Sequence, residues 1–245
     1  LILGGAGFIG FNLAKYLVDN KDYEVTIADN LSRGKKDNYI NDLLSNKNVS
    51  LVEGDFTEAK TFDLLAKNYD YCYMLASVVG VNNTLKIPGE IIRINTSLIL
   101  NTLEWLKGGA AKNVVFTSTS ENYAGTIDKF GYEVPTAEDV PLSITDISHP
   151  RYTYAVTKML GESGFLNYGK SYNFKTTIVR YHNVIGPRMG FKHVIPHLAE
   201  RFLVNNENPF KLYGHDQTRS FCYITDAVVG TVLAMESDKS DGEIY

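Results

Sequence analysis

Tyr154 and Lys158 stand four residues apart in Tyr154-Ala-Val-Thr-Lys158 and pair a weak acid with a fixed cation. In a helix, residues i and i+4 lie on one face, with Cβ atoms about 5–6 Å apart. A phenol with an ordinary pKa of about 10 is a poor base at neutral pH, and lowering that pKa by about three units takes about 4 kcal/mol. Nearby positive charge can supply this stabilisation. The pair predicts a general base, Tyr154, whose pKa is lowered by Lys158, although isolated pairs of this kind also decorate helix surfaces.

Glycines at 4, 7 and 10 follow the apolar run Leu1-Ile2-Leu3 and open a helical pattern. They let a strand turn sharply into a helix whose first amide groups, those of Phe8 and Ile9 included, approach a pyrophosphate. The spacing is Gly-x-x-Gly-x-x-Gly and differs from the commonest dinucleotide fingerprint. The strand-turn-helix context still favours a dinucleotide site over a simple turn.

Asp29 ends the next strand-like run and is followed by Asn30. An acidic residue at this place hydrogen-bonds the adenine ribose hydroxyls. Its carboxylate would repel a 2′-phosphate, which favours NAD over NADP, whereas Arg33 and Lys35 could soften the preference. The alternative is that Asp29 only starts a turn with Asn30.

The elements that must position these residues alternate between strand and helix, which predicts right-handed βαβ units and a parallel sheet. The expected strands are mostly unbroken apolar runs, as in sheets covered on both faces. Ligands of such sheets bind beyond the carboxyl ends of the strands, so chemistry is expected in the loops at about 120–150 and 182–193. The expected strands are 1–3, 23–29, 49–53, 71–76, 113–117 and 175–181, and the expected helices are 8–20, 58–67, 90–107, 152–168 and 194–205.

Composition is that of an ordinary soluble globular protein: 245 residues, 44% hydrophobic and 21% charged, enough for one large or two unequal domains. The net charge of −4 gives no basis for expecting nucleic-acid or anionic-membrane binding. Cys72 and Cys222 show no metal or disulfide spacing, and no metal is expected. No apolar run reaches the roughly 18 residues of a membrane span. We expect a cytoplasmic protein without a signal peptide, and both ends of the sequence look incomplete.

With the glycines, Asp29 and the Tyr154/Lys158 pair in register, the sequence resembles the extended short-chain dehydrogenase/reductase family. More narrowly, it is similar over its whole length to the members that act on nucleotide sugars: 4-epimerases, 4,6-dehydratases, decarboxylases and 4-dehydrogenases. The resemblance implies an α/β fold with a Rossmann-type doubly wound parallel sheet and a small, partly missing C-terminal substrate region. It assigns residues 1–181 to an NAD-binding domain and 182–245 to an interleaved nucleotide-sugar-binding region.

The same resemblance implies further cofactor contacts. Asp55, followed by Phe56, would bind the adenine amino group, while a plain turn is the alternative. Leu75, Ala76 and Ser77 would lie against the cofactor, although Met74 stands where the family often has histidine. Asn95 would be the family's helix-borne asparagine, with a polar residue on a helix surface as the alternative. Lys158 would also hold the nicotinamide ribose.

Around the reacting sugar, the resemblance implies that Thr119 or Ser120 orients O4 while Tyr154 removes its proton. Glu121 divides the candidate reactions, because galactose-type epimerases tend to lack a carboxylate here whereas dehydratases and uronate decarboxylases carry one. Ser120-Glu121 in place of Asp-Glu weakens a deoxythymidine-sugar dehydratase and leaves GDP-mannose-type dehydratases and decarboxylases open. A hydroxyl-rich turn is the alternative for this segment.

The substrate residues implied by the resemblance come after the sixth strand. Asn183 would bind the diphosphate, Arg188 phosphate or ribose, and the segment around Lys192 and Val194 the nucleotide base. Arg219 offers a bidentate fork to the pyrophosphate. Asp226 is expected to be the N-cap of a following helix.

These residues predict an NAD-dependent enzyme that oxidises C4 of a GDP- or UDP-linked sugar to a 4-ketone. The motifs around 118–121, 182–190 and 192–196 are similar to those of bacterial capsule-pathway enzymes, including GDP-manno-heptose 4-dehydrogenases. A C4 dehydrogenase or epimerase ranks first, and a 4,6-dehydratase or UDP-glucuronate decarboxylase second. A non-catalytic dinucleotide-binding sensor and a hydroxysteroid-type dehydrogenase are more remote. Family analogy predicts a homodimer through the helices at 90–107 and 152–168.

Overall fold

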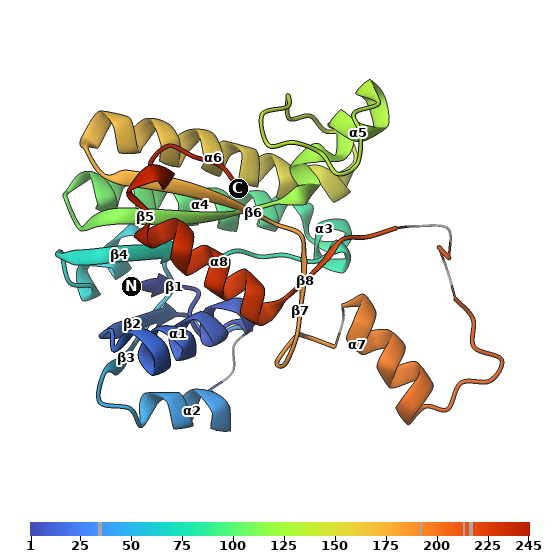
Figure 1. Cartoon of the computed structure of the whole chain (residues 1–245), viewed down its shortest axis with the longest axis horizontal. Coiled ribbons are helices and arrows are strands. Elements are labelled where there is room, and N and C mark those ends of the chain that lie inside the picture. Colours follow the sequence, from blue (N-terminus) through green and yellow to red (C-terminus); the bar gives the residue numbers. More distant parts are fainter. Residues whose placement is uncertain (34–35, 192, 213, 216–217) are drawn as a thin grey trace.

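Six parallel strands form the main sheet of the protein. The computed structural model describes residues 1–33, 36–191, 193–212, 214–215 and 218–245 (Figure 1). The expected strands at 49–53 and 175–181 have the predicted bounds, and the others differ by a few residues at their ends. The strands are β1 (Ile2–Leu3), β2 (Val25–Asp29), β3 (Val49–Glu53), β4 (Tyr69–Met74), β5 (Ala111–Thr119) and β6 (Lys175–Tyr181).

The strand order is β3-β2-β1-β4-β5-β6, which is the order of a doubly wound dinucleotide-binding sheet. Leu3 of β1 pairs with Ala28 of β2 on one side and with Met74 of β4 on the other. The chain therefore reverses its direction of growth between β1 and β4, where such sheets bind their ligands. The predicted Rossmann-type fold is confirmed. All carboxyl ends point toward the side that carries α3 (Val81–Lys86) and α5 (Ala124–Phe130) (Figure 1).

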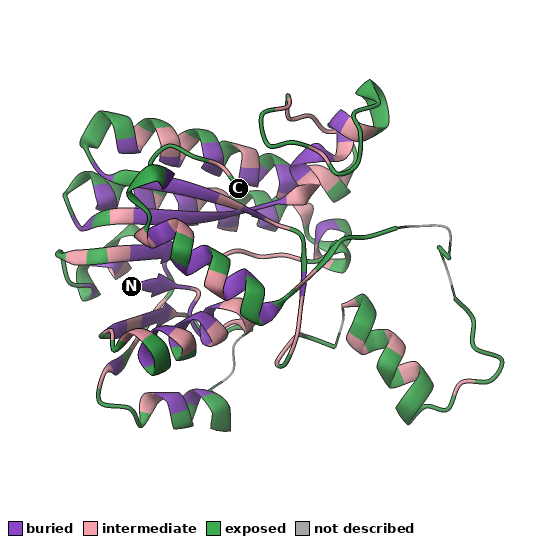
Figure 2. Cartoon of the chain, in the orientation of Figure 1, coloured by how far each residue is buried: buried purple, intermediate pink, exposed green. Residues whose placement is uncertain are grey.

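Helices cover both faces of this sheet. One face packs against α1 (Phe8–Lys21) and α8 (Ile224–Glu236), and the other against α4 (Pro88–Lys107) and α6 (Thr153–Tyr172). Successive strand residues point to opposite faces, so Ile2 joins the first core and Leu3 the second. Figure 2 shows the resulting band of buried residues along the strands between the two helical layers.

Helix α6 lies unusually close to the sheet because Gly161 faces it. A Cβ atom at Gly161 would lie 2.2 Å from the ring of Phe116 on β5. Phe165, one turn further on, stacks on the same ring with centroids 4.7 Å apart. The sequence thus holds the start of α6, which carries the predicted base, against the end of β5.

Several short elements were not expected from the sequence. The predicted helix at 58–67 is a 3-10 helix over Ala59–Leu64, and the one at 194–205 splits into α7 (Val194–Ala199) and a π turn over Glu200–Val204. The N-cap of α8 is Tyr223, so the prediction that Asp226 caps it is wrong; Asp226 lies within the first turn. The other elements not expected are α2 (Asn38–Leu44), α3, α5, β7 (Asn183–Ile185), β8 (Phe221–Tyr223) and the 3-10 helices Ser120–Tyr123, Pro150–Tyr152 and Asp238–Ser240.

Residues after 181 contribute to the first core as well as forming a two-stranded parallel sheet of β7 and β8. Glu236 at the end of α8 accepts hydrogen bonds from Lys21 (2.8 Å) and Tyr23 (2.9 Å). At the chain's end, Ile244 makes a parallel bridge to Ile178 of β6. The boundary at 181/182 stays a prediction.

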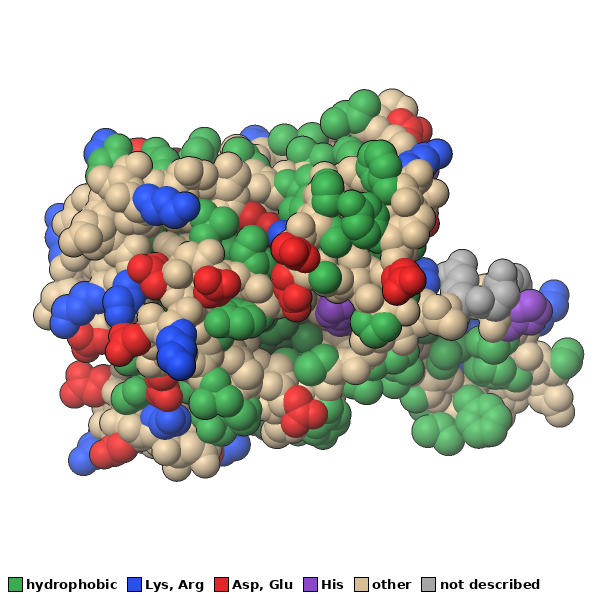
Figure 3. All heavy atoms as spheres, turned by 45° about the horizontal axis from the view of Figure 1, so that its top comes forward, with side chains coloured by type: hydrophobic (Ala, Val, Ile, Leu, Met, Phe, Trp, Pro, Cys, Tyr) green, Lys and Arg blue, Asp and Glu red, His purple; other side chains and the backbone are tan. Residues whose placement is uncertain are grey.

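The surface in Figure 3 carries acidic and basic side chains interspersed over the sheet-and-helix body, in keeping with the small net charge of −4. Among the described residues, none of the helices is long and apolar enough to cross a membrane. No group of three or more His, Cys, Asp or Glu side chains within the described ranges is arranged to hold a metal ion.

Candidate active site

The glycine loop leaves β1 in a conformation that depends on Gly4 and Gly10. Gly4 has φ +82°, and a Cβ atom there would lie 2.7 Å from the backbone nitrogen of Ala76. A Cβ atom at Gly10 would lie 2.4 Å from the carbonyl oxygen of Gly4. Gly7 is the extended N-cap of α1, and Phe8 and Ile9 form its first turn. The loop thus brings a helix N-terminus against the end of the sheet, where its amides can meet a pyrophosphate.

Asp29 fastens the end of β2 to this loop. Its Oδ2 accepts a hydrogen bond from the Ala6 amide (3.0 Å) and its Oδ1 one from the Leu31 amide (2.8 Å). Burial raises the pKa of Asp29, and these two hydrogen bonds oppose the rise. Asn30 accepts from the Ser32 amide, so a turn does start here. Asp29 therefore both starts a turn and lies beside the glycine loop, and its position fits a contact with the ribose.

Asp55 and Phe56 are less well placed than the sequence suggested. The Asp55 carboxylate accepts from the amide (3.0 Å) and the hydroxyl (2.8 Å) of Thr57, which is the turn that was the alternative. The Phe56 side chain is buried and meets Phe62 with ring centroids 5.2 Å apart. Because the Phe56 ring fills the core, only the backbone of Phe56 remains available to a cofactor, and the expected contact stays a prediction.

Asn95 is 1% exposed, so its interpretation as a surface residue is wrong. Its amide accepts from the Val78 nitrogen (2.7 Å) and donates to the Val78 oxygen (3.1 Å) and to Thr157 Oγ1 (3.3 Å). The side chain thus joins α4, α6 and the segment after β4. It positions the run Leu75, Ala76 and Ser77. In this run the Leu75 amide donates to the Leu3 carbonyl, and the Ala76 backbone lies against Gly4.

Tyr154 and Lys158 both point to the edge where these loops meet. Lys158 is 2% exposed, and its Nζ donates to the carbonyl of Thr117 (2.7 Å) and lies 5.8 Å from the Tyr154 ring centroid. The Tyr154 phenol interacts with the hydroxyls of Ser77 and Thr119. Since Ser77 follows the residue that touches Gly4, the phenol faces the glycine loop as predicted.

Burial dominates the pKa values of both Tyr154 and Lys158. Burial raises the pKa of Tyr154, the charge of Glu121 raises it further, and the interactions with Ser77, Arg33 and Thr119 only oppose the rise. Burial also lowers the pKa of Lys158 to about 7, against an attraction from Glu162. Lys158 is not among the groups that lower the pKa of Tyr154, whose rise comes mainly from burial, so the lowering expected from the sequence stays a prediction.

Thr119, Ser120 and Glu121 follow directly at the end of β5. Thr119 Oγ1 accepts from the Glu121 amide (3.2 Å) and so caps the 3-10 helix that begins at Ser120. Burial raises the pKa of Glu121, opposed first by the charge of Arg151 and then by that of Arg219. A carboxyl group with a raised pKa and cationic neighbours therefore lies next to the proposed base.

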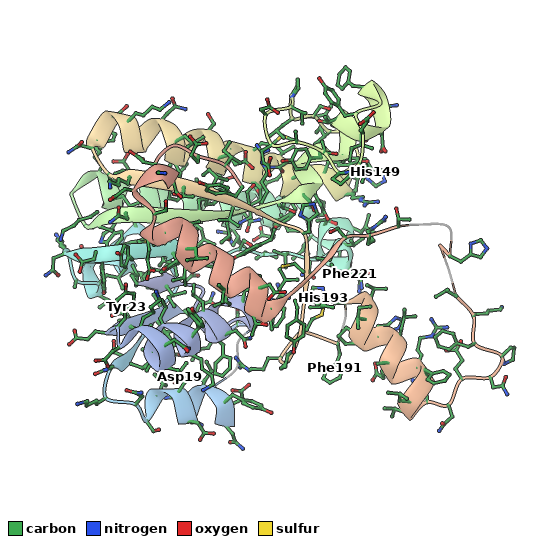
Figure 4. All side chains as sticks on the ribbon, viewed as in Figure 1. Asp19, Tyr23, His149, Phe191, His193 and Phe221 are labelled. Atoms are coloured by element: carbon green, nitrogen blue, oxygen red, sulfur yellow. The ribbon has the colours of Figure 1, made fainter. Side chains whose placement is uncertain are left out.

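Arg151 is a site residue that the sequence reasoning missed. It lies in the 3-10 helix Pro150–Tyr152, directly before α6, where its amide donates to His149 Nδ1 (3.2 Å). Figure 4 places His149 at the carboxyl edge of the sheet, beside α5, and Tyr23 at the opposite edge. The signal available in the sequence was its spacing, three residues before Tyr154 in Arg151-Tyr-Thr-Tyr154.

The residues expected to bind substrate lie along β7 and β8 and the segments around them. Asn183 Nδ2 donates to the Ser220 carbonyl (3.0 Å), which joins the two strands next to Arg219. Arg219 donates to the Thr218 carbonyl (2.7 Å), and its positive charge opposes the rise in the pKa of Glu121. Val194 is exposed at the start of α7. Lys192, like Lys35, lies outside the described residues.

Arg188 is directed away from this group. Its guanidinium forms an ion pair with Asp37 (2.6 Å) and lies 4.3 Å over the Phe11 ring and 5.7 Å over Tyr39. Its side chain is 12% exposed. An acidic residue and two aromatic rings thus contact the guanidinium, and the expected phosphate or ribose contact stays a prediction.

His193 is the N-cap of α7 and is labelled in Figure 4 together with Phe191 and Phe221. Burial and the charge of Arg33 lower the pKa of His193. The charge of Arg33 also opposes the rise in the pKa of Tyr154.

A cavity of about 510 Å³ lies elsewhere, between β6 and α8. Tyr181, Ala227, Thr231 and Leu233 are among its lining residues. None of the predicted site residues lines it, so we assign the chemistry to the carboxyl edge of the sheet.

Comparison with known proteins agrees with this arrangement. The family model described as "NAD dependent epimerase/dehydratase family" matches residues 1–245. A UDP-N-acetyl-alpha-D-glucosaminuronate decarboxylase from Bacillus cytotoxicus is 36% identical, over 100% of this chain and 73% of its own. Among solved structures, a UDP-glucuronic acid 4-epimerase from Bacillus cereus, in complex with UDP-glucuronic acid and NAD, is similar with a TM-score of 0.82 and 26% identity, over 99% of this chain and 75% of that one. A UDP-N-acetylglucosamine 4-epimerase from Methanobrevibacter ruminantium gives a TM-score of 0.82 and 28% identity, over 99% and 74%.

Proposed function

The chain belongs to the NAD-dependent epimerase/dehydratase family, and from that premise we propose that it oxidises C4 of a UDP-linked hexuronate and then releases C6 as carbon dioxide. Its membership makes it an NAD-dependent enzyme of nucleotide-sugar chemistry. The observation that carries the finer proposal is Arg151, whose positive charge reaches Glu121 beside the Tyr154 phenol.

The residues at the head of the sheet fit NAD. The lack of Cβ atoms at Gly4 and Gly10 lets the loop pack tightly against Ala76 and against its own backbone, which leaves the first amides of α1 available to a pyrophosphate. Asp29, beside this loop, would accept from ribose hydroxyls and repel a 2′-phosphate. Bound NAD would accept the hydride of C4 and later return it, and its oxidised ring would bring a positive charge near Tyr154.

Tyr154 removes the proton of the sugar O4 as C4 is oxidised. Thr119, whose hydroxyl already interacts with the phenol, holds O4 toward it. Lys158 is fixed on the Thr117 carbonyl near the Tyr154 ring, and its ammonium group would hold the nicotinamide ribose of bound NAD. Positioned proton transfer of this kind contributes roughly 10²–10⁴-fold to a rate.

Arg151 would bind the C6 carboxylate. Its side chain is exposed, and it begins three residues before the base on the same run of helix. Once C4 is a ketone, C6 is a β-keto carboxylate: the C5–C6 bond breaks, its electron pair moves to the C4 oxygen, and carbon dioxide leaves. Glu121, whose pKa burial raises, is placed to give C5 its proton. With the hydride that bound NAD would return to C4, the reaction would be redox-neutral overall.

The diphosphate is assigned to Arg219 and Asn183. Asn183 begins β7 and is bonded to Ser220, so it lies close to Arg219, which comes two residues before β8. The planar guanidinium of Arg219 can make two parallel hydrogen bonds to phosphate oxygens. A UDP group is favoured over GDP because the similar proteins above carry UDP in their names.

A 4-epimerase is the second candidate, because the similar structures include 4-epimerases and Tyr154 would serve that reaction equally. The sequence alone ranked a 4-dehydrogenase or 4-epimerase first, and Arg151 is what moves the preference to a uronate decarboxylase. A GDP-manno-heptose substrate and a role in capsule synthesis stay predictions.

The proposal is tested by incubating purified protein and NAD with UDP-glucuronate, UDP-N-acetylglucosaminuronate, UDP-glucose and GDP-manno-heptose. Mass spectrometry of the products and the release of labelled carbon dioxide from C6 are measured. We expect carbon dioxide from one of the two uronates. A 4-epimer without carbon dioxide would establish the second candidate, and a keto sugar from GDP-manno-heptose would restore the first-ranked prediction from sequence.

Arg151→Met tests the residue that carries the proposal. We expect the KM for the uronate to rise about 10–100-fold, since a carboxylate loses a charged hydrogen-bond partner worth about 1.5–3 kcal/mol. Arg93→Met, which removes an exposed arginine from α4, is the control and should leave KM unchanged. An unaltered KM in Arg151→Met would remove the basis for a uronate.

A homodimer is proposed through α4 and α6. The two helices pack together, so that a Cβ atom at Gly164 would lie 2.9 Å from Leu103. Ile92 and Leu100 on α4 and Leu160 on α6 are exposed apolar residues on this pair. Sedimentation of the protein and of Leu160→Lys checks this: the wild type should be dimeric and the variant monomeric at the same concentration.

A further inference from the structure

A buried ion pair lies behind the loop that carries Thr119, Ser120 and Glu121. Glu162 on α6 and Arg180 on β6 approach to 2.8 Å, and their side chains are 5% and 4% exposed. The carboxylate and the guanidinium meet side on, with a second hydrogen bond from Arg180 Nε to Glu162 Oε1 (3.0 Å). Neither residue belongs to the motifs that predicted the site.

Glu162 holds both ends of the loop. Its Oε1 also accepts from the hydroxyl of Ser118, the residue before Thr119. The amide of Asn122, the residue after Glu121, donates to the same oxygen (2.8 Å) and to Ser118 Oγ (3.1 Å). The loop is therefore bound at its entry and its exit to the helix that carries Tyr154.

Arg180 extends the same network. Its Nη1 donates to the Tyr123 hydroxyl (2.6 Å) and to the carbonyl of Glu138 (3.0 Å), and its guanidinium lies 5.0 Å over the Tyr123 ring. Tyr123 ends the 3-10 helix that begins at Ser120. The network thus reaches from β6 through the loop to the long segment after α5.

Stability alone does not account for such a pair. The desolvation of two buried charges commonly cancels their attraction, and replacing a buried pair by apolar groups of similar volume is often neutral or stabilising. The pair can still matter for the rate, because displacing a reacting group by about 1 Å can lower the rate about 100-fold. Through its bonds to Ser118 and Asn122, Glu162 ties the loop with the expected O4 ligands to α6, which carries the base, and Arg180 holds Glu162 in place.

We propose that Glu162 and Arg180 are positioning residues, which hold Thr119, Ser120 and Glu121 in place against Tyr154. The inference rests on the proposed function only for its kinetic readout. The ordering of residues 117–123 is a property of the protein itself.

Glu162 also faces Lys158, one helical turn before it. The groups around the Lys158 ammonium are Tyr154 and Glu162 on its own helix, the Thr117 carbonyl and the Phe116 ring from β5, and Arg180 beyond Glu162 from β6. Burial lowers the pKa of Lys158 to about 7, and Glu162 is the charge that opposes this. Removing that negative charge while Arg180 remains would lower the pKa further.

Hydrogen exchange of residues 117–123 and steady-state kinetics over pH test the proposal, with Glu162→Gln and Ser118→Ala as variants. We expect faster exchange confined to this segment in both variants, and kcat lowered at least about tenfold with KM for the nucleotide sugar changed less than about threefold. In Glu162→Gln the alkaline loss of kcat/KM should move to lower pH, whereas in Ser118→Ala it should stay. Glu90→Gln, which removes the carboxylate of the exposed pair with Arg93, is the control and should change none of these.

A double variant separates positioning from stability. Glu162→Met combined with Arg180→Met should keep or regain the free energy of unfolding while kcat stays low and exchange of 117–123 stays fast. Restored kcat in the double variant, or unchanged exchange in both single variants, would overturn the proposal. If the wild type turned over none of the nucleotide sugars, the proposed function would fail, and the exchange rates would still decide whether the pair orders this segment.

Discussion

Replacing Lys158 by methionine is expected to make the cofactor-free protein more stable at neutral pH. The ammonium group is 2% exposed, and its pKa falls from the ordinary 10.5 to about 7 because burial penalises the charge. That difference corresponds to about 5 kcal/mol at most. The methionine variant gives up one charged hydrogen bond, to the Thr117 carbonyl, worth about 1.5–3 kcal/mol. A net gain of about 2–3 kcal/mol in the free energy of unfolding is expected near pH 6.5.

The gain should depend on pH with a defined sign. Because the folded-state pKa of Lys158 lies below that of the unfolded chain, the unfolded wild type binds more protons between pH 7 and 10.5. Wild-type stability therefore rises with pH through this window, and the penalty is full only below it. The advantage of Lys158→Met should shrink by about 2 kcal/mol between about pH 6.5 and 8.5.

Urea unfolding of NAD-free protein at several pH values measures this directly. Lys112→Met is the matched control, since Lys112 is exposed and paired with Asp70, so its removal should change stability little and without this pH trend. A Lys158→Met variant that is less stable than wild type at pH 6.5, or an advantage that does not change with pH, would refute the reasoning. Loss of turnover is expected in the same variant, because the cation that costs stability serves the reaction.

Three further changes are expected to separate chemistry from cofactor binding. Tyr154→Phe should lower turnover roughly 10²–10⁴-fold while NAD and nucleotide-sugar affinities, measured by calorimetry, stay within a few-fold; a protein whose cellular function is unchanged by it would be a dinucleotide sensor. Gly10→Ala should cost about 1–3 kcal/mol in urea unfolding and weaken NAD binding, because its Cβ would lie 2.4 Å from the Gly4 carbonyl, whereas Gly89→Ala, with no atom within 4 Å of the new Cβ, should do neither. Asp29→Asn should raise the ratio of NADP to NAD affinity, measured by fluorescence titration, and an unchanged ratio would contradict the proposed ribose contact.

Local patterns in the sequence were enough to predict the main strands and the long helices of the fold. The segments 49–53 and 175–181, rich in β-branched and other strand-favouring residues, gave strands with correct bounds. The short helices α2, α3 and α5 were missed, since six or seven residues leave too few turns for a helical period to appear.

Distance along the chain limited what could be said of the site. Spacing alone brought Tyr154 and Lys158 together, but burial, which depends on β5 and on Gly161, set the direction of both pKa changes. The convergence of Arg151 and Arg219 on Glu121 joins three remote segments and leaves no trace in local periodicity. Asp226 was predicted to be the N-cap of α8. The N-cap is Tyr223, in an extended conformation, and Asp226 lies in the first turn of the helix.

The ion pair between Arg188 and Asp37 has a consequence for building chimeras with relatives of other specificity. It ties residues 151 positions apart and seats the guanidinium between Phe11 and Tyr39. A crossover placed after β6 would import a foreign loop opposite these partners and leave Asp37 and two aromatic rings without their cation. A chimera that exchanges the nucleotide-sugar segment should therefore also take Phe11, Asp37 and Tyr39 from the same donor protein. The arginine of the new loop then keeps the partners with which it pairs in the donor.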